Sequence, residues 1–147
     1  MAVICSFFGH RECSIEVEEV LTAEIERHIT EYGVDTFYVG GYGRFDQLAA
    51  GLMYKFKERY PYIEVCHILA YLPREKEPEF EVRHHPTLYP EGLETISYKF
   101  AITHRNRIIV ERSDYLIGYV GLCSGGAYEA LAYAERLKKQ IVNLWSY

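Results

Sequence analysis

The chain has 147 residues, of which 49% are hydrophobic, and a formal net charge of −5. This length and apolar content suit one folded domain and exclude a disordered, solvated tail. The negative charge argues against a general affinity for nucleic acid, because that affinity needs a basic face that displaces counterions from phosphates. A small phosphate ligand stays open, since a local cluster of donors is enough to bind it.

Five apolar runs rich in Val, Ile, Phe and Tyr are predicted to form strands. They span residues 3–8, 36–39, 63–72, 115–120 and 141–145. Such near-continuous apolar runs are typical of strands covered by helices on both faces.

Helical patterns separate most of these runs. Residues 15–32 place their apolar side chains on one helical face, and Gly33 follows as a C-cap. The next helix is expected to begin at Asp46, a good N-cap residue, and to stop before Pro61. Two more helices are predicted over residues 101–112 and 127–138. This alternation predicts a Rossmann-like three-layer α/β fold, with a mainly parallel sheet of about five strands and helices on both faces.

Residues 73–97 differ from the rest of the chain. They contain four of the 5 prolines and many charges, and they show no clear periodicity. We predict a single domain over residues 1–147, with a long excursion at 73–97 of the kind that is usually functional.

The cysteines Cys5, Cys13, Cys66 and Cys123 form no CxxC pair, which predicts reduced thiols in a cytoplasmic protein. The histidines lack the spacing of a metal motif, so we predict no metal site and no cofactor. The apolar start is too short to span a membrane, and no later run is long enough, so no membrane association is expected.

Three glycine-bearing turns are expected at the carboxyl edge of the sheet, where parallel sheets bind ligands. They follow the first, second and fourth strands. Glycine lets a phosphate approach the backbone, and helix N-termini offer free N–H donors. The first turn does not read GxGxxG, so an ordinary NAD-binding domain is not predicted. The candidate ligand-binding residues are Gly9, His10, Arg11, Gly40, Gly41, Tyr42, Gly43, Arg44, Asp46, Asn106, Ser124, Gly125, Gly126 and Ala127.

Two residues are candidates for catalysis. Arg105, on the predicted third helix, could face an anion over the sheet edge, or it could be a solvated arginine. Glu129, just inside the fourth helix, could act at a sugar carbon, or it could only complement the helix dipole.

These motifs also resemble a known family. Residues 5–11 (CSFFGHR) resemble the opening of YpsA-like proteins, and residues 40–46 (GGYGRFD) resemble their second-strand loop. Residues 105–107 (RNR), Ser113-Asp114 and Gly125-Gly126 follow in order. The resemblance places the chain in the SLOG superfamily, beside LOG-like and DprA-like branches. It implies a Rossmann-like sheet that binds nucleotides, nucleotide sugars or related signals. With the apolar helix around residues 100–110, it also implies a homodimer.

The LOG branch hydrolyses the N-glycosidic bond of nucleoside monophosphates. Residues 125–129 are similar to the end of its Pro-Gly-Gly-x-Gly-Thr-x-x-Glu loop, and Arg105 matches its arginine, but Gly121-Leu122-Cys123 stands where Pro-Gly-Gly is expected. Residues 124–134 are also similar to the Gly-Thr-x-x-Glu helix start of nucleoside deoxyribosyltransferases, where the glutamate is the nucleophile.

We therefore predict a domain that binds a nucleotide or nucleotide-derived ligand, as a sensor or carrier. The alternative is an N-glycosidase or glycosyl transferase that uses Glu129 and Arg105. A third possibility is an interaction module with a vestigial pocket.

Overall fold

The computed structural model describes residues 2–40, 43–68, 87–88 and 98–145. Within them, six strands form one sheet in the order β4-β3-β2-β1-β5-β6, and every pairing is parallel. The strands are β1 (Ile4–Gly9), β2 (Thr36–Val39), β3 (Glu64–Ile68), β4 (Thr87–Leu88), β5 (Tyr115–Tyr119) and β6 (Gln140–Asn143).

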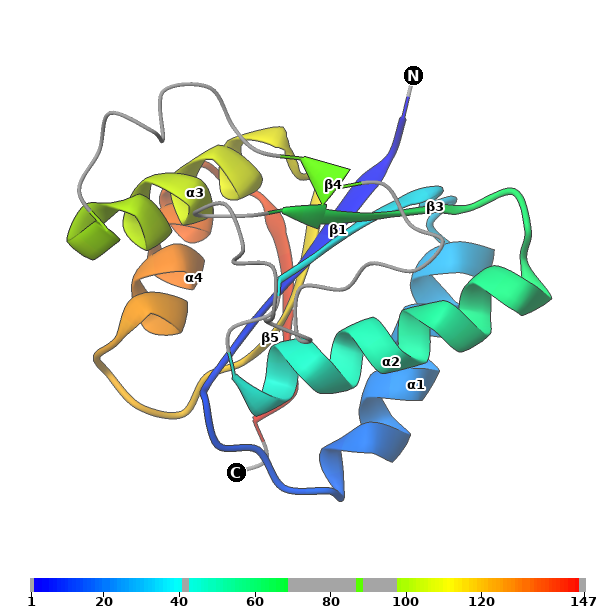
Figure 1. Ribbon diagram of the computed structural model, residues 1–147, viewed down its shortest axis with the longest axis horizontal. Helices are drawn as coiled ribbons and strands as arrows, with labels where there is room; N and C mark the ends of the chain where they lie inside the picture. The colour runs from blue at the N-terminus through cyan, green and yellow to red at the C-terminus, as the bar shows by residue number, and fades with distance from the viewer. Residues whose placement is uncertain (1, 41–42, 69–86, 89–97, 146–147) are drawn as a thin grey trace.

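Two helices cover each face of the sheet, which gives three layers (Figure 1). On one face, α1 (Val17–Thr30) and α2 (Arg44–Arg59) bury their apolar residues against the strands. On the other face, α3 (Tyr98–Arg112) and α4 (Gly126–Arg136) pack in the same way. The predicted fold class, a Rossmann-like α/β fold with a parallel sheet, is confirmed.

The strand order reverses between β1 and β5. The chain runs outward from β1 through β2, β3 and β4, and then returns to the opposite side of β1 with β5 and β6. In open parallel sheets, ligands bind outside the carboxyl ends of the strands at such a switch point. The ends of β1 and β5 are therefore the first place to search for a site.

Two details differ from the sequence-based expectation. The sheet has a sixth strand, β4, which lies inside the predicted excursion; the rest of residues 73–97 is outside the described residues. Helix α2 begins at Arg44, and Asp46 is a buried residue of its first turn rather than the N-cap. Helix α3 buries Ala101, Ile109 and Val110 against the rest of the chain, whereas Ile102 and Ile108 of the same helix are partly exposed. The homodimer stays a prediction.

The remaining composition-based expectations concern thiols, metals and membranes. All four cysteines are unpaired, and Cys5 and Cys66 are buried. Among the described residues, no three histidine, cysteine or carboxylate side chains gather as a metal site would require. None of the helices in the described ranges has the length and apolar content that a bilayer crossing needs.

Candidate functional site

A cavity of about 770 Å³ opens at the carboxyl ends of β1 and β5, and we call it the edge cavity. It brings together five segments that are far apart in the sequence, around residues 8–12, 46, 102–106, 119–127 and 145. Ten of the residues predicted from sequence line it: Gly9, His10 and Arg11 after β1, Asp46 from α2, Arg105 and Asn106 from α3, and Ser124, Gly125, Gly126 and Ala127 before and within α4.

His10 joins the loop after β1 to the loop after β5. Its Nε2 accepts hydrogen bonds from the backbone N–H groups of Gly121 and Leu122, at 2.9 and 3.2 Å. In this arrangement Nε2 is the acceptor of both bonds, which links the two loops through one ring nitrogen. His10 thus fixes both loops at the floor of the site.

An aromatic wall borders the same cavity. Trp145 lies with its ring centroid 5.7 Å from that of His10 and 4.9 Å from that of Tyr119. Tyr119 in turn stacks on Phe45, with centroids 6.0 Å apart. Trp145, Tyr119 and His10 all line the cavity, so they offer ring surface to a flat ligand.

Arg105 is buried, with 4% of its surface exposed, and its guanidinium organises the neighbouring side chain. Its Nε and Nη2 donate to Oδ1 of Asn106 at 3.2 and 2.6 Å, and Nη1 donates to the carbonyl of Ile68 at 3.2 Å. Because a guanidinium only donates, Oδ1 of Asn106 must face it and Nδ2 must face away. Arg105 therefore adds positive charge to the cavity wall and aims an amide donor.

Residues at the two ends of the glycine-rich loop after β2 pack against residues that line the cavity. A Cβ on Gly40 would lie 2.8 Å from Nη1 of Arg105 and 2.9 Å from Oδ2 of Asp46, so a larger residue there would displace at least one of these two buried groups. The backbone of Gly43, with φ +114°, lies against Arg11, and the N–H of Arg44 donates to the carbonyl of Arg11 at 2.8 Å. Gly40, Gly43 and Arg44 were expected to bind ligand, but none of them lines the cavity. The predicted Gly41 and Tyr42 are outside the described residues.

Helix α4 begins at the edge cavity without a side-chain cap. Its N-cap, Gly125, has φ +101° and ψ 170°, a conformation that glycine alone adopts readily. The first N–H groups of a helix have no intrahelical partner and carry the positive end of its dipole. Gly125, Gly126 and Ala127 all line the cavity, so these donors are available to an anion.

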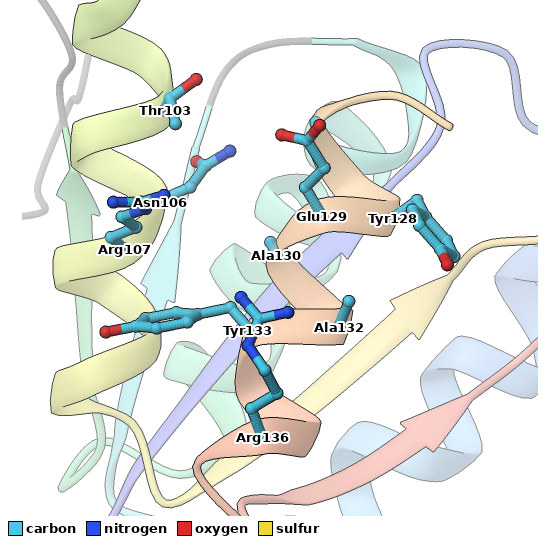
Figure 2. Close-up of a pocket in the computed structure, with 10 residues that line it drawn as sticks. Thr103, Asn106, Arg107, Tyr128, Glu129, Ala130, Ala132, Tyr133 and Arg136 are labelled. Carbon is cyan, nitrogen blue, oxygen red and sulfur yellow. The ribbon is translucent and has the colours of Figure 1, made fainter. Parts of the chain in front are cut away.

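Glu129 lines a second, smaller cavity of about 390 Å³ between α3 and α4, which we call the interhelical cavity (Figure 2). Thr103, Arg107, Tyr133 and Arg136 line it as well. Arg105 lines only the edge cavity, so the two predicted catalytic residues do not share a cavity.

The interhelical cavity was not predicted from the sequence. Tyr133 forms part of its wall, and the guanidinium carbons of Arg107 and Arg136 lie 5.8 and 5.5 Å from its ring centroid. The hydroxyl of Tyr133 donates to Oε2 of Glu111 at 2.6 Å, and this bond raises the pKa of Tyr133. Asn106 and Gly126 line both cavities and mark where they meet.

Comparison with known proteins identifies neighbours by structure only. No family model matches the sequence, and no curated protein does. DNA processing protein A (DprA) from Streptococcus pneumoniae superimposes with a TM-score of 0.71 at 15% identity, over 95% of this chain and 49% of that one. DprA from Helicobacter pylori gives 0.68 at 14% identity, over 95% and 63%. The Moco carrier protein from Chlamydomonas reinhardtii gives 0.54 at 16% identity, over 97% and 76%.

The expectation of no general nucleic-acid binding is contradicted by these neighbours. The DprA of Helicobacter pylori has the same fold and binds single-stranded DNA. Net charge is a sum over the whole surface, so a negative total does not exclude a local cluster of donors that binds phosphates. The chain spans about half to two thirds of the length of the DprA proteins, so the likeness covers one part of them. The chain is similar to the DprA proteins in fold alone, and this shared fold is Rossmann-like.

Proposed function

We propose that the chain binds a nucleotide or nucleotide-derived ligand in the edge cavity, as a sensor or carrier domain. The observation that carries this proposal is the joint presence, at the switch point of the sheet, of an uncapped helix start and an aromatic wall. The first suits a phosphate, and the second suits a base. The YpsA-like motifs of the sequence agree with this proposal.

The donors of the cavity suit a phosphate group. The first amides of α4, Nδ2 of Asn106 and the exposed guanidinium of Arg11 border the same space. The volume of about 770 Å³ is within the range of roughly 300–1,000 Å³ that is typical of small-molecule sites. Single-stranded DNA belongs among the ligands to test, because it carries the same phosphates and bases and a DprA of this fold binds it.

The N-glycosidase alternative has less support. It needs Glu129 and Arg105 to act on one glycosidic bond, and the two side chains line different cavities. Moreover, the Arg105 guanidinium already makes hydrogen bonds with Asn106 and Ile68. A binding domain requires neither residue to meet a reacting atom.

The proposal is tested with two neighbouring arginines, of which one lines the edge cavity and the other does not. Arg11 lines the edge cavity, whereas Arg44, which is also exposed, does not. We expect Arg11→Glu to abolish the rise in melting temperature that the ligand produces, because it sets a carboxylate against the phosphate. We expect Arg44→Glu to retain that rise.

The measurement is a thermal-shift screen against nucleoside mono- and diphosphates, nucleotide sugars and a single-stranded oligonucleotide. The chain has 1 tryptophan, Trp145, at the cavity wall, so its fluorescence gives a second, local readout. A wild-type shift in Arg11→Glu, or equal loss in both variants, would contradict the proposed site. Release of free base would instead support the enzyme.

A further inference from the structure

Asn106 has a donor that the fold leaves unused. The side chain is buried, with 8% of its surface exposed, and Oδ1 accepts two bonds from Arg105. Nothing in the described part of the chain accepts a hydrogen bond from Nδ2, which faces Gly126 at the junction of the two cavities. Because Asn106 lines both cavities, this amide donor is accessible from them, and an acceptor atom of a ligand could pair with it there.

The interhelical cavity is charged unevenly. Arg107 and Arg136 contact the ring of Tyr133, and neither forms an ion pair with a carboxylate among the residues described. Figure 2 shows Glu129 at the opposite end of the cavity, beside the start of α4. The cavity thus presents two cations at one end and one carboxylate at the other.

We propose that the interhelical cavity is a second subsite of the same ligand, and that this ligand contains two nucleoside units joined by a phosphodiester. The proposal rests on the proposed function, which places the first unit in the edge cavity. The linking phosphate lies at the junction, where Nδ2 of Asn106 and the first amides of α4 donate to it.

The second unit matches the remaining charges. A further phosphate lies against Arg107 and Arg136, which make charge-assisted hydrogen bonds to phosphate oxygens. The Glu129 carboxylate accepts a hydrogen bond from a sugar hydroxyl. The volume of about 390 Å³ is at the lower end of the range of roughly 300–1,000 Å³ for small-molecule sites, so it suits a single unit.

The test compares mononucleotides with the matching 5′-phosphorylated dinucleotides by calorimetry on the full chain. In the wild type, we expect the best dinucleotide to bind roughly tenfold more tightly than its mononucleotide, as one added charge-assisted contact would give. Arg107→Ala/Arg136→Ala should remove this advantage and leave mononucleotide affinity unchanged, because neither arginine lines the edge cavity. The charge-matched control is Lys55→Ala/Arg59→Ala on α2, across the sheet, which should retain it.

The outcomes separate the two proposals. If mononucleotides bind and dinucleotides bind no more tightly, or if the double arginine variant keeps the advantage, the second subsite is refuted and the proposed function stands. If neither class of ligand binds the wild type, both are refuted.

Two sources could supply a dinucleotide unit, a free dinucleotide or a stretch of single-stranded nucleic acid. A ten-residue single-stranded oligonucleotide distinguishes them. If the oligonucleotide binds at least as tightly as the dinucleotide, and the double arginine variant weakens this binding, the subsite is assigned to single-stranded nucleic acid. Exclusion of the oligonucleotide assigns it to the free compound.

Discussion

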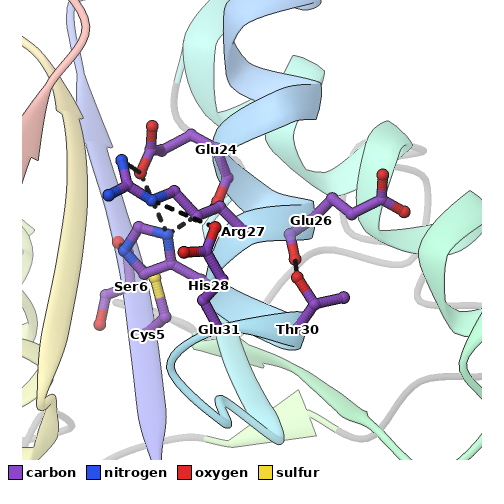
Figure 3. A network of polar contacts seen from close by, with 8 residues as sticks. All are labelled: Cys5, Ser6, Glu24, Glu26, Arg27, His28, Thr30 and Glu31. Atoms are coloured by element: carbon purple, nitrogen blue, oxygen red, sulfur yellow. Dashed lines mark hydrogen bonds and ion pairs between the residues drawn. The ribbon is translucent and has the colours of Figure 1, made fainter.

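At the scale of single residues, His28 is the clearest case of an environment that sets a proton equilibrium. Its side chain is 1% exposed and lies edge-on to the rings of Tyr32 and Tyr115, at 4.9 and 5.5 Å between centroids. Burial lowers the pKa of His28 and outweighs Glu24, whose carbonyl oxygen lies 2.7 Å from Nδ1 (Figure 3). Glu24 raises the pKa, and the charge of Arg27 lowers it further.

This environment predicts a loss of stability in acid. In the unfolded chain a histidine has a pKa of about 6.5, and in the folded chain the pKa of His28 is lower. As the pH falls below about 6.5, the His28 imidazole is therefore protonated in the unfolded state before it is protonated in the folded state. The free energy of unfolding decreases as a result. We expect His28→Gln to reduce the difference in urea midpoint between pH 7.5 and pH 5.5.

The control for this prediction is His104→Gln, on α3, which should keep the wild-type difference. Equal pH dependence in wild type and His28→Gln would show that other groups cause the acid sensitivity.

At the scale of elements, the two described glycine-rich loops that precede helices end in the same way. Gly43 before α2 has φ 114° and ψ 174°, and Gly125 before α4 has φ 101° and ψ 170°. Side chains are strained in this region of backbone space. The glycines here set the direction in which each helix leaves the sheet edge.

The adjacent glycines of α4 allow a matched test. Gly125→Ala should lower the free energy of unfolding by about 1 to 3 kcal/mol through backbone strain alone, since a Cβ there would meet nothing within 4 Å. Gly126→Ala should cost less, because its Cβ would make only an ordinary contact, 3.7 Å from Nδ2 of Asn106. Chemical denaturation measures both, and equal losses would contradict the strain argument.

Most elements could be predicted from the sequence, because the spacing of apolar residues and the residues that begin and end a helix are local features of the chain. The two-residue strand β4 could not, since Thr87–Leu88 gains its order from pairing with β3, and nothing in its own sequence marks it. The same limit applies to the site. The glycine loops were visible as motifs, but the role of Gly40 depends on Arg105 and Asp46, which are distant in sequence. The interhelical cavity depends on how α3 and α4 pack, so Tyr133 and Arg136 gave no signal.

At the scale of the whole molecule, the sheet divides the interior into two cores, and each contains one buried cysteine. Cys5 belongs to the core under α1 and α2, and Cys66 to the core under α3 and α4. Burial raises the pKa of both thiols, which keeps them protonated and unreactive. Cys123 is exposed in the loop before α4, and Cys13 is partly exposed.

The rates of thiol labelling at Cys5 and Cys66 should therefore report the opening of each core separately. At pH 8, with DTNB or a maleimide, we expect Cys123 to react first and Cys13 next. Cys5 and Cys66 should react only as the molecule opens. Mass spectrometry of the labelled peptides gives the rate at each position, and labelling of Cys5 as fast as Cys123 would contradict the described packing.

The hydrogen bonds of His10 to the loop after β5 have a consequence for the speed of recognition. Because one imidazole links both loops, the ligand of the proposed function would meet loops that are already held together. Preorganised sites lose little conformational freedom when they bind. In the proposed function, encounter rather than rearrangement would then set the association rate at this end of the cavity, and ligands would differ in affinity mainly through their dissociation rates.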